Sequence, residues 1–219
     1  MSKTATLVGA SGLIGSHLLQ LLLDDPYFDT VKILVRRSLP LTHPKLERKL
    51  VDFNDNDSLL VAIDNSDVLF CSVGTTQKKV KGDKDAYRKV DFDIPVKMAR
   101  FCKLTGCETF ILVSAVGADN RSKNFYLKLK GEAEEAVRTT GIGSVYFMRP
   151  SVLLGKRKEF RLGERIFTPL ARIFSFLLPP KYKPVQANVV AKAMVAAAKK
   201  ADEGVHVWEY REMREEVLG

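Results

Sequence analysis

The chain has 219 residues, 46% of them hydrophobic and 28% charged, which is ordinary for a globular protein. No apolar run approaches the roughly 18 residues that a membrane span needs, and the N-terminus lacks the charged-then-apolar pattern of a secretory leader. The net charge of +9 would suit nucleic acid, an anionic membrane or an anionic ligand. However, the basic residues are scattered and no nucleic-acid-reading motif accompanies them, so we expect a solvated basic surface and no nucleic-acid partner.

Apolar runs alternate with helical patterns along most of the chain. Strands are expected at 4–9, 31–36, 49–52, 67–73, 109–114 and 144–149. Helices are expected at 12–24, 57–63, 84–104, 124–140 and 187–200. This alternation predicts an α/β fold of the Rossmann type, a doubly wound parallel sheet with helices on both faces, in a single domain spanning 1–219.

The most informative stretch is the strand, tight turn and helix that open the chain. Glycines recur in it as Gly9-x-x-Gly12-x-x-Gly15. They let the backbone approach a pyrophosphate closely, and the helix N-terminus offers free N–H groups and a positive dipole end. The cofactor-binding residues expected in this turn are Gly9, Ser11, Gly12, Leu13, Ile14 and Gly15.

The end of the second strand decides between the two nicotinamide cofactors. NAD sites place an acidic residue there for the ribose 2′-hydroxyl, whereas this strand ends in Arg36 and Arg37. One guanidinium suits a 2′-phosphate and the other can stack on adenine, so we expect NADPH. The alternative is a pair of surface arginines.

Two later strand ends add candidate cofactor contacts. Asp52 and Phe53 follow the third strand, where an acid can accept from the adenine amino group, although a helix N-cap would also explain an acid there. The fourth strand runs into a loop of small residues. This loop either contacts the ribose or phosphate of the cofactor or is a plain turn. The loop residues expected to bind cofactor are Val73, Gly74, Thr75 and Thr76.

A catalytic group is expected after the fifth strand. Ser114 ends that strand, and Tyr126 and Lys130 share one face of the following helix because they are four residues apart. A phenol titrates at roughly pH 10, and a nearby ammonium favours its phenolate. Such a phenol can donate a proton to a carbonyl oxygen, to which a serine hydroxyl can also hydrogen-bond.

Beyond Pro150 the pattern becomes irregular. Residues 151–186 are rich in proline and glycine, and we expect them to form a small substrate-side lobe. A membrane-surface helix is the rival interpretation of 164–178. Helices 84–104 and 124–140 could form the face of a homodimer.

The cysteines and histidines indicate no further chemistry. Cys71, Cys102 and Cys107 have no zinc spacing, so we expect no metal and reduced thiols in a cytoplasmic protein. The histidines, none of which has a plausible catalytic partner nearby in sequence, are His17, His43 and His206.

Taken together, these motifs resemble the short-chain dehydrogenase/reductase superfamily in its atypical branch. The first-motif spacing is that branch's form. The segments CSVGTT at 71–76, VSAVGAD at 113–119, NFYLKLKGE at 124–132 and RPSVLLG at 149–155 are similar to those of the Tat-interacting-protein group of oxidoreductases. The similarity covers roughly 4–200, and 186–191 resembles the late helix start that frames the substrate side.

The resemblance implies roles for matching positions. Ser114, Tyr126 and Lys130 would be the catalytic triad, with Lys130 also holding the nicotinamide ribose. The residues that would contact the nicotinamide end are Pro150, Ser151 and Val152. One position departs from the superfamily, because many members carry Asn, as part of a proton relay, where this chain has Asp91.

The sequence therefore predicts an NADPH-dependent oxidoreductase that reduces a carbonyl or related small organic substrate. The alternative is a regulatory or scaffold protein that binds NADPH with little or no turnover.

Overall fold

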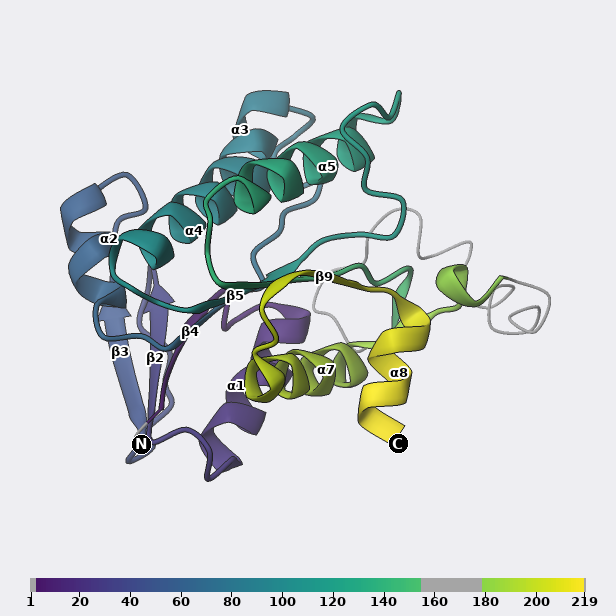
Figure 1. The fold of residues 1–219 in the computed structure, drawn as a ribbon. Coiled ribbons are helices and arrows are strands. Elements are labelled where there is room, and N and C mark those ends of the chain that lie inside the picture. The colour runs from purple at the N-terminus through teal and green to yellow at the C-terminus, as the bar shows by residue number, and fades with distance from the viewer. Residues whose placement is uncertain (1–2, 155–178, 219) are drawn as a thin grey trace.

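The computed structural model describes residues 3–154 and 179–218 (Figure 1). Its centre is a seven-stranded sheet, parallel throughout, in the order β3-β2-β1-β4-β5-β6-β9. The strands are β1 Thr4–Val8, β2 Thr30–Val35, β3 Leu46–Leu50, β4 Val68–Cys71, β5 Thr109–Val113, β6 Ser144–Met148 and β9 Gly204–Trp208. A separate short parallel pair joins β7 Leu153–Leu154 to β8 Val185–Gln186.

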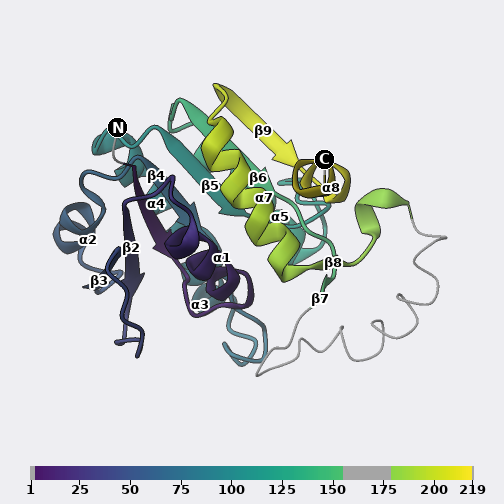
Figure 2. The same cartoon turned by 90° about the horizontal axis from the view of Figure 1, so that it is seen from below.

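Helices cover both faces of the sheet (Figures 1 and 2). One face carries α2 Asn56–Ile63, α3 Lys84–Arg88, α4 Ile94–Leu104 and α5 Phe125–Arg138. The other carries α1 Leu13–Asp24 and α7 Ala187–Lys200, and α8 Tyr210–Leu218 packs beside α7. The expected α/β fold, a doubly wound parallel sheet, is confirmed.

The sheet separates two hydrophobic cores, because successive residues of a strand face opposite sides. In β1, Leu7 joins the core shared with α1 and α7, while Val8 joins the core shared with α2 and α4. Strands buried on both faces are apolar at most positions, which explains why the central strands are rich in Val, Ile, Leu and Phe, with Thr6, Lys32 and Thr109 as buried polar exceptions.

The edges of the sheet differ from the sequence expectation. The third strand spans Leu46–Leu50 rather than 49–52, and its exposed Glu47 and Arg48 mark it as an edge strand. Charged side chains on an edge discourage pairing with other chains, but they also hide the strand from a search for apolar runs. Helix α8 was not expected, and β9 corresponds to a strand-like run at 205–208 that was not counted among the expected strands of the sheet.

The expected helix 84–104 is interrupted. Between α3 and α4 the residues Lys89–Asp93 form a π-helical turn. Pro95 in the first turn of α4 has no N–H, and its ring would clash with the carbonyl of residue 91 in a regular helix. The wider π turn accommodates this proline, and such turns often occur at functional sites.

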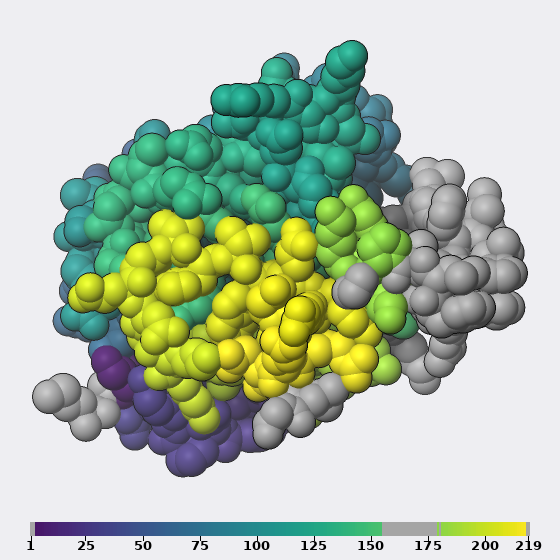
Figure 3. Space-filling model, turned by 45° about the vertical axis from the view of Figure 1, so that its right-hand side comes forward, coloured from purple at the N-terminus to yellow at the C-terminus, as the bar shows by residue number. Residues whose placement is uncertain are grey.

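The C-terminal elements adjoin the start of the chain. In Figure 3 they appear in yellow beside the purple N-terminal segment. Among the helices of the described residues, none is long and apolar enough to cross a bilayer. Most of the expected lobe 151–186 lies outside the described residues, as does all of 164–178, the segment with the rival membrane-surface interpretation.

Candidate functional site

The strand register brings the expected site segments to one edge of the sheet. Val8 is level with Leu34 of β2 and with Cys71 of β4. Val113 of β5 is level with Met148 of β6. All these strands are parallel, so the residues that follow their carboxyl ends gather at the same edge, where ligands of doubly wound folds bind.

The glycine turn is closely packed against β4. Gly9 has a positive φ of 96°, and a Cβ there would stand 2.8 Å from the backbone carbon of Ser72. A Cβ on Gly15 would stand only 2.1 Å from the carbonyl oxygen of Gly9. Because both positions exclude any side chain, the turn lies directly beneath the first helix, as a pyrophosphate-binding turn requires.

The N-terminus of α1 is suited to an anion. Its N-cap is Gly12, and within the described residues no side chain caps the helix. The backbone N–H groups of the first turn, which includes Leu13 and Ile14, therefore point out of the helix end next to Ser11. This cradle fits the phosphates of a dinucleotide.

The expected adenine-side residues follow β2 and β3. Arg36 and Arg37 are exposed directly after Val35, next to the glycine turn because β2 pairs with β1. Asp52 does not cap α2, whose N-cap is Asp55. Its Oδ1 accepts from the backbone and side-chain nitrogens of Asn54, each at 2.9 Å. It is thus an exposed loop acid beside half-buried Phe53.

The loop after β4 is anchored at one residue. Thr75 is buried, its backbone N–H donates to Asp91 Oδ2 at 2.8 Å, and its carbonyl accepts from the Tyr87 hydroxyl at 3.2 Å. The flanking residues are open to ligands to different degrees. Gly74 is exposed, and Val73 and Thr76 are half-buried.

Ser114 presents a buried hydroxyl at the end of β5. Its backbone N–H donates to the carbonyl of Met148 at 2.7 Å, which fixes the residue to β6. Its side-chain oxygen is buried and has no hydrogen-bond partner within residues 3–154 and 179–218. A buried polar atom without a partner is costly, so an acceptor or donor from a bound molecule fits there.

Helix α5 carries the other two catalytic candidates. Asn124 caps it by accepting from the backbone N–H groups of Tyr126 and Leu127, at 3.0 and 3.2 Å. Gly131 lets the loop after β5 pack on the helix, since a Cβ there would meet the backbone of Asp119 at 2.3 Å. The half-buried Tyr126 and buried Lys130 are therefore held against the loop that begins at Ser114.

Lys130 forms a buried ion pair that the sequence did not predict. Its Nζ lies 2.9 Å from Asp91 Oδ1, and the two side chains are 4% and 0% exposed. Burial alone would lower the pKa of Lys130, but the charges of Asp91 and Tyr126 outweigh it and raise that pKa above its ordinary value. The sequence marked Asp91 only as a departure from the superfamily.

The segment after β6 meets the loop after β5. The backbone N–H of Val116 donates to the carbonyl of Pro150 at 3.0 Å, and the Ser151 hydroxyl donates to the carbonyl of Lys183. Val185 donates to the carbonyl of Val152 at 3.0 Å. The three residues expected at the nicotinamide end thus lie between the loop after β5 and the start of α7.

Two further buried ionisable side chains, Glu134 of α5 and Cys71 of β4, lie near the candidate site. Glu134, one turn beyond Lys130, accepts two hydrogen bonds from the Arg149 guanidinium, at 3.0 and 2.5 Å. This pair joins α5 to β6, and nothing in the sequence spacing identified it. Burial raises the pKa of the Cys71 thiol to about 12, so the thiol stays neutral.

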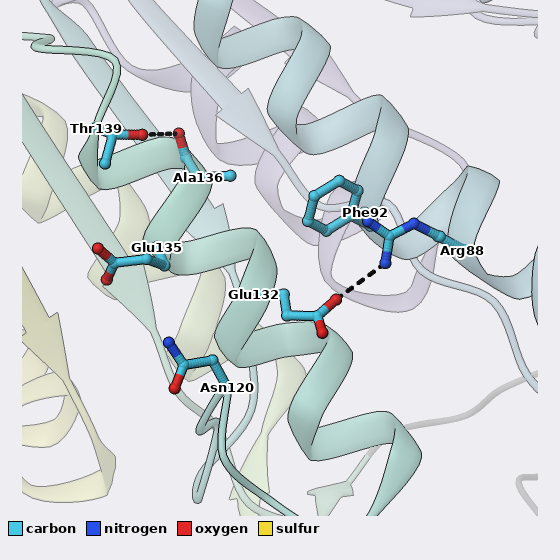
Figure 4. A pocket seen from close by; sticks show the side chains of 7 residues that line it. All are labelled: Arg88, Phe92, Asn120, Glu132, Glu135, Ala136 and Thr139. Atoms are coloured by element: carbon cyan, nitrogen blue, oxygen red, sulfur yellow. Dashed lines mark hydrogen bonds and ion pairs between the residues drawn. The ribbon is translucent and has the colours of Figure 1, made fainter.

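A separate open hollow of about 460 Å³ lies between the α3–α4 region and α5 (Figure 4). Arg88 crosses it, pairing with Glu132 at 2.9 Å and stacking on Phe92 at 3.9 Å. The remaining lining residues are Asn120, Glu135, Ala136 and Thr139. None of the expected site residues lines this hollow. It occupies the face for which we expect dimerisation, and that expectation stays a prediction.

Comparison with known proteins agrees with this geometry. A family model described as NAD(P)H-binding matches residues 9–201. Protein HTATIP2 of Rattus norvegicus is 36% identical over 200 residues, covering 89% of this chain and 80% of its own. Protein FMP52, mitochondrial, of Candida glabrata is 35% identical over 204 residues, covering 90% and 86%.

Solved structures share the fold at low identity. MoeE5 in complex with UDP-glucose and NAD is 18% identical with a TM-score of 0.71, covering 97% of this chain and 80% of its own. The Bordetella bronchiseptica enzyme WbmH in complex with NAD+ is 17% identical with a TM-score of 0.73, covering 95% and 76%. These likenesses concern the architecture of the sheet and its helices.

The expectation of a cytoplasmic protein is contradicted. It rested on three unpaired cysteines, which the structure describes as buried free thiols. The FMP52 relatives of Candida glabrata, Aspergillus clavatus and Candida albicans are all named mitochondrial. Reduced cysteines do not distinguish between these compartments. Within the described residues no cluster of metal-ligating side chains occurs.

Proposed function

The chain belongs to the NAD(P)H-binding family with the short-chain dehydrogenase/reductase fold, and we propose that it is an NADPH-dependent oxidoreductase. Its substrate would be a carbonyl compound or a related small organic molecule. The observation that carries the proposal is the buried, unpartnered Ser114 hydroxyl, at the same sheet edge as the glycine cradle. Ser58 and Ser144 also bury hydroxyls without a partner in the described part of the chain, but Ser58 lies within α2 and Ser144 begins β6, so of these three serines only Ser114 follows the carboxyl end of a strand.

Each residue of the site has a chemical task in this reaction. Bound NADPH would supply the hydride. The Tyr126 phenol donates a proton to the carbonyl oxygen of the substrate, and the Ser114 hydroxyl hydrogen-bonds the same oxygen. The Lys130 ammonium attracts the negative charge left on the phenol oxygen and holds a ribose hydroxyl of the cofactor.

The other residues at this edge of the sheet bind and orient the cofactor. The first turn of α1 receives the pyrophosphate, and Arg36 and Arg37 hold the 2′-phosphate and the adenine face. Asp52 and Phe53 border the adenine, while Thr75 and its neighbours contact ribose or phosphate. Residues 150–152 border the nicotinamide, and a lobe at 151–186 would select the substrate within a single domain.

The first experiment is a calorimetric titration of the purified protein with NADPH and with NADH, followed by a carbonyl screen. We expect tight NADPH binding, weak NADH binding and NADPH oxidation with a carbonyl substrate. Tyr126→Phe should abolish turnover and retain cofactor affinity. Tyr27→Phe, a half-buried tyrosine at the opposite end of α1, serves as the matched control and should keep both. Binding of neither cofactor would refute the proposal.

A second candidate is a protein that binds NADPH and regulates a partner. The observation in its favour is that the names of the HTATIP2 and FMP52 relatives state no reaction. It predicts tight NADPH binding, no turnover in a broad carbonyl screen, and a partner response that Tyr126→Phe leaves unchanged. Loss of that response in Tyr126→Phe would argue against it.

The FMP52 names also support a location for the chain. We place it in mitochondria, and fractionation of cells that express the full chain with a C-terminal tag tests this. Enrichment in the cytosolic fraction would contradict the assignment.

A further inference from the structure

The ion pair between Lys130 and Asp91 is the most completely buried charge pair in the described residues. An ammonium taken out of water without a counter-charge loses its proton or destabilises the fold. Lys130 avoids both outcomes because a carboxylate oxygen lies 2.9 Å from its Nζ. Asp91 is thus the group that allows a charged lysine at this depth.

The other groups that face Lys130 cannot replace Asp91. They are the Tyr126 phenol on its own helix and the Cys71 thiol on β4. The thiol is neutral because burial raises its pKa to about 12. Glu134 lies one turn further along α5 and is bound by Arg149. No other carboxylate of the described residues is paired with Lys130.

The backbone directs Asp91 inward and ties it to the cofactor side. Asp91 stands in the π turn that precedes Pro95, and its second oxygen accepts from the Thr75 N–H at 2.8 Å. The hydroxyl of Tyr87 donates to the Thr75 carbonyl, while its ring meets the ring of Tyr126 edge-on at 6.3 Å. One carboxylate therefore connects the catalytic helix with the loop after β4.

We propose that Asp91 is a positioning residue that keeps the buried Lys130 ammonium charged and directed toward Tyr126 and the β4 loop. The ion pair is a property of the cofactor-free protein, whereas its catalytic meaning rests on the proposed function. Asparagine at this position retains an acceptor for Thr75 and has the same shape, but it carries no charge. The substitution Asp91→Asn therefore removes the ion pair alone.

The test is the stability of Asp91→Asn without cofactor, measured by urea unfolding from neutral pH to about pH 10, near the ordinary lysine pKa of about 10.4. In the wild-type protein the pKa of Lys130 is higher in the folded than in the unfolded state. The stability contributed by the ion pair is therefore fully present below the unfolded-state pKa and is lost as the pH rises through the folded-state pKa. In the variant, unopposed burial lowers the lysine pKa, and the side chain sheds its proton as the pH rises. We expect about half or more of the loss in midpoint urea concentration to disappear by about pH 10.

Two variants separate charge from packing. Glu134→Gln leaves Arg149 without its carboxylate, but a guanidinium stays protonated over this range, so its loss of stability should not change with pH. In Asp91→Asn with Lys130→Met, both charges are gone, and stability should recover relative to Asp91→Asn. A loss in Asp91→Asn that is as pH-independent as that of Glu134→Gln would overturn the proposal, as would a double variant no more stable than the single one.

Enzyme activity provides a separate test of the role of Asp91. If the wild type turns over, Asp91→Asn should shift the basic limb of the kcat/KM profile to lower pH, because the Lys130 ammonium then loses its proton at a lower pH. An unchanged basic limb in a folded variant would contradict the proposal. A wild type without NADPH binding or turnover would refute the proposed function, whereas the urea experiment would still decide the role of Asp91.

Discussion

Replacing Gly15 with alanine tests the closest contact of the glycine turn. A Cβ at this position would stand 2.1 Å from the carbonyl oxygen of Gly9 and 2.8 Å from the hydroxyl oxygen of Ser72. The Gly9 carbonyl is held in place, because it accepts from the Gly12 N–H at 2.9 Å and from the Ser72 hydroxyl at 3.3 Å. Helix α1 must therefore move away from the turn to admit the new methyl group.

Two opposing effects set the change in stability that Gly15→Ala causes. Alanine in place of glycine within a helix ordinarily gains about 0.5–1 kcal/mol from reduced backbone entropy. Overpacking a tight site typically costs about 1–3 kcal/mol, and a contact this short against fixed backbone is at the upper end. We expect a net loss of about 2 kcal/mol, which for a chain of this size lowers Tm by about 4–8 °C. Displacing the helix N-terminus should also weaken NADPH binding by about tenfold or more, the equivalent of about 1.4 kcal/mol.

Calorimetric unfolding and an NADPH titration measure both quantities. Gly12→Ala is the matched control, because its φ of −76° suits alanine and its nearest neighbour is the Gly9 oxygen at 3.2 Å. That variant should lose less than about 1 kcal/mol of stability, yet bind NADPH less well, since its methyl group occupies the turn itself. If Gly15→Ala melts and binds like the wild type, or if Gly12→Ala is the less stable of the two, the turn does not have the packing that we infer.

Three further outcomes follow from the site. Ser114→Ala should leave the urea midpoint unchanged or slightly raised, because its buried hydroxyl has no partner in the described residues, while kcat falls by about 100-fold or more. Replacing Arg36 and Arg37 together with alanine should raise the Kd of NADPH by about tenfold or more and leave that of NADH nearly unchanged by calorimetry, because only NADPH carries the 2′-phosphate. Glu134→Gln should cost about 2 kcal/mol in urea unfolding at neutral pH, because it leaves the Arg149 guanidinium unpaired in a partly buried place. Equal losses for both cofactors, or a Glu134→Gln variant as stable as the wild type, would contradict these expectations.

The fold could be predicted because its signals are local. Strands buried on both faces leave continuous apolar runs, and the turn before α1 needs glycine at positions where a Cβ has no room. The first and last helices of the expected set lie within one residue of their observed bounds. The bounds predicted for the edge strand β3 were wrong, because its charged residues, which protect the sheet edge, carry no apolar signal.

The candidate site could be predicted only in part. Ser114, Tyr126 and Lys130 are recognisable because each has a fixed place relative to a strand end or a helix turn. The partnership of Lys130 with Asp91 depends on contact between segments far apart in sequence and on a π turn. The same is true of Glu134 and Arg149, since no spacing rule links a helix residue with the end of the next strand. Contacts of this kind follow from packing rather than from local pattern.

Helices α1 and α7 pack in one core, although the ribosome makes them far apart in time. Leu18 and Leu22 of α1 pack in the same core as Ala191 and Met194 of α7, and roughly 160 residues separate the two helices. At a ribosomal rate of about 5–20 residues per second, the apolar face of α1 waits about 8–30 seconds for its cover. The buried residues of the opposite core, shared with α2 and α4, all lie at or before Phe147, and of the described residues only Val205 and Val207 of β9 join it later. The nascent protein therefore exists for a time as a sheet with one covered face and one exposed apolar face, a form that chaperones bind.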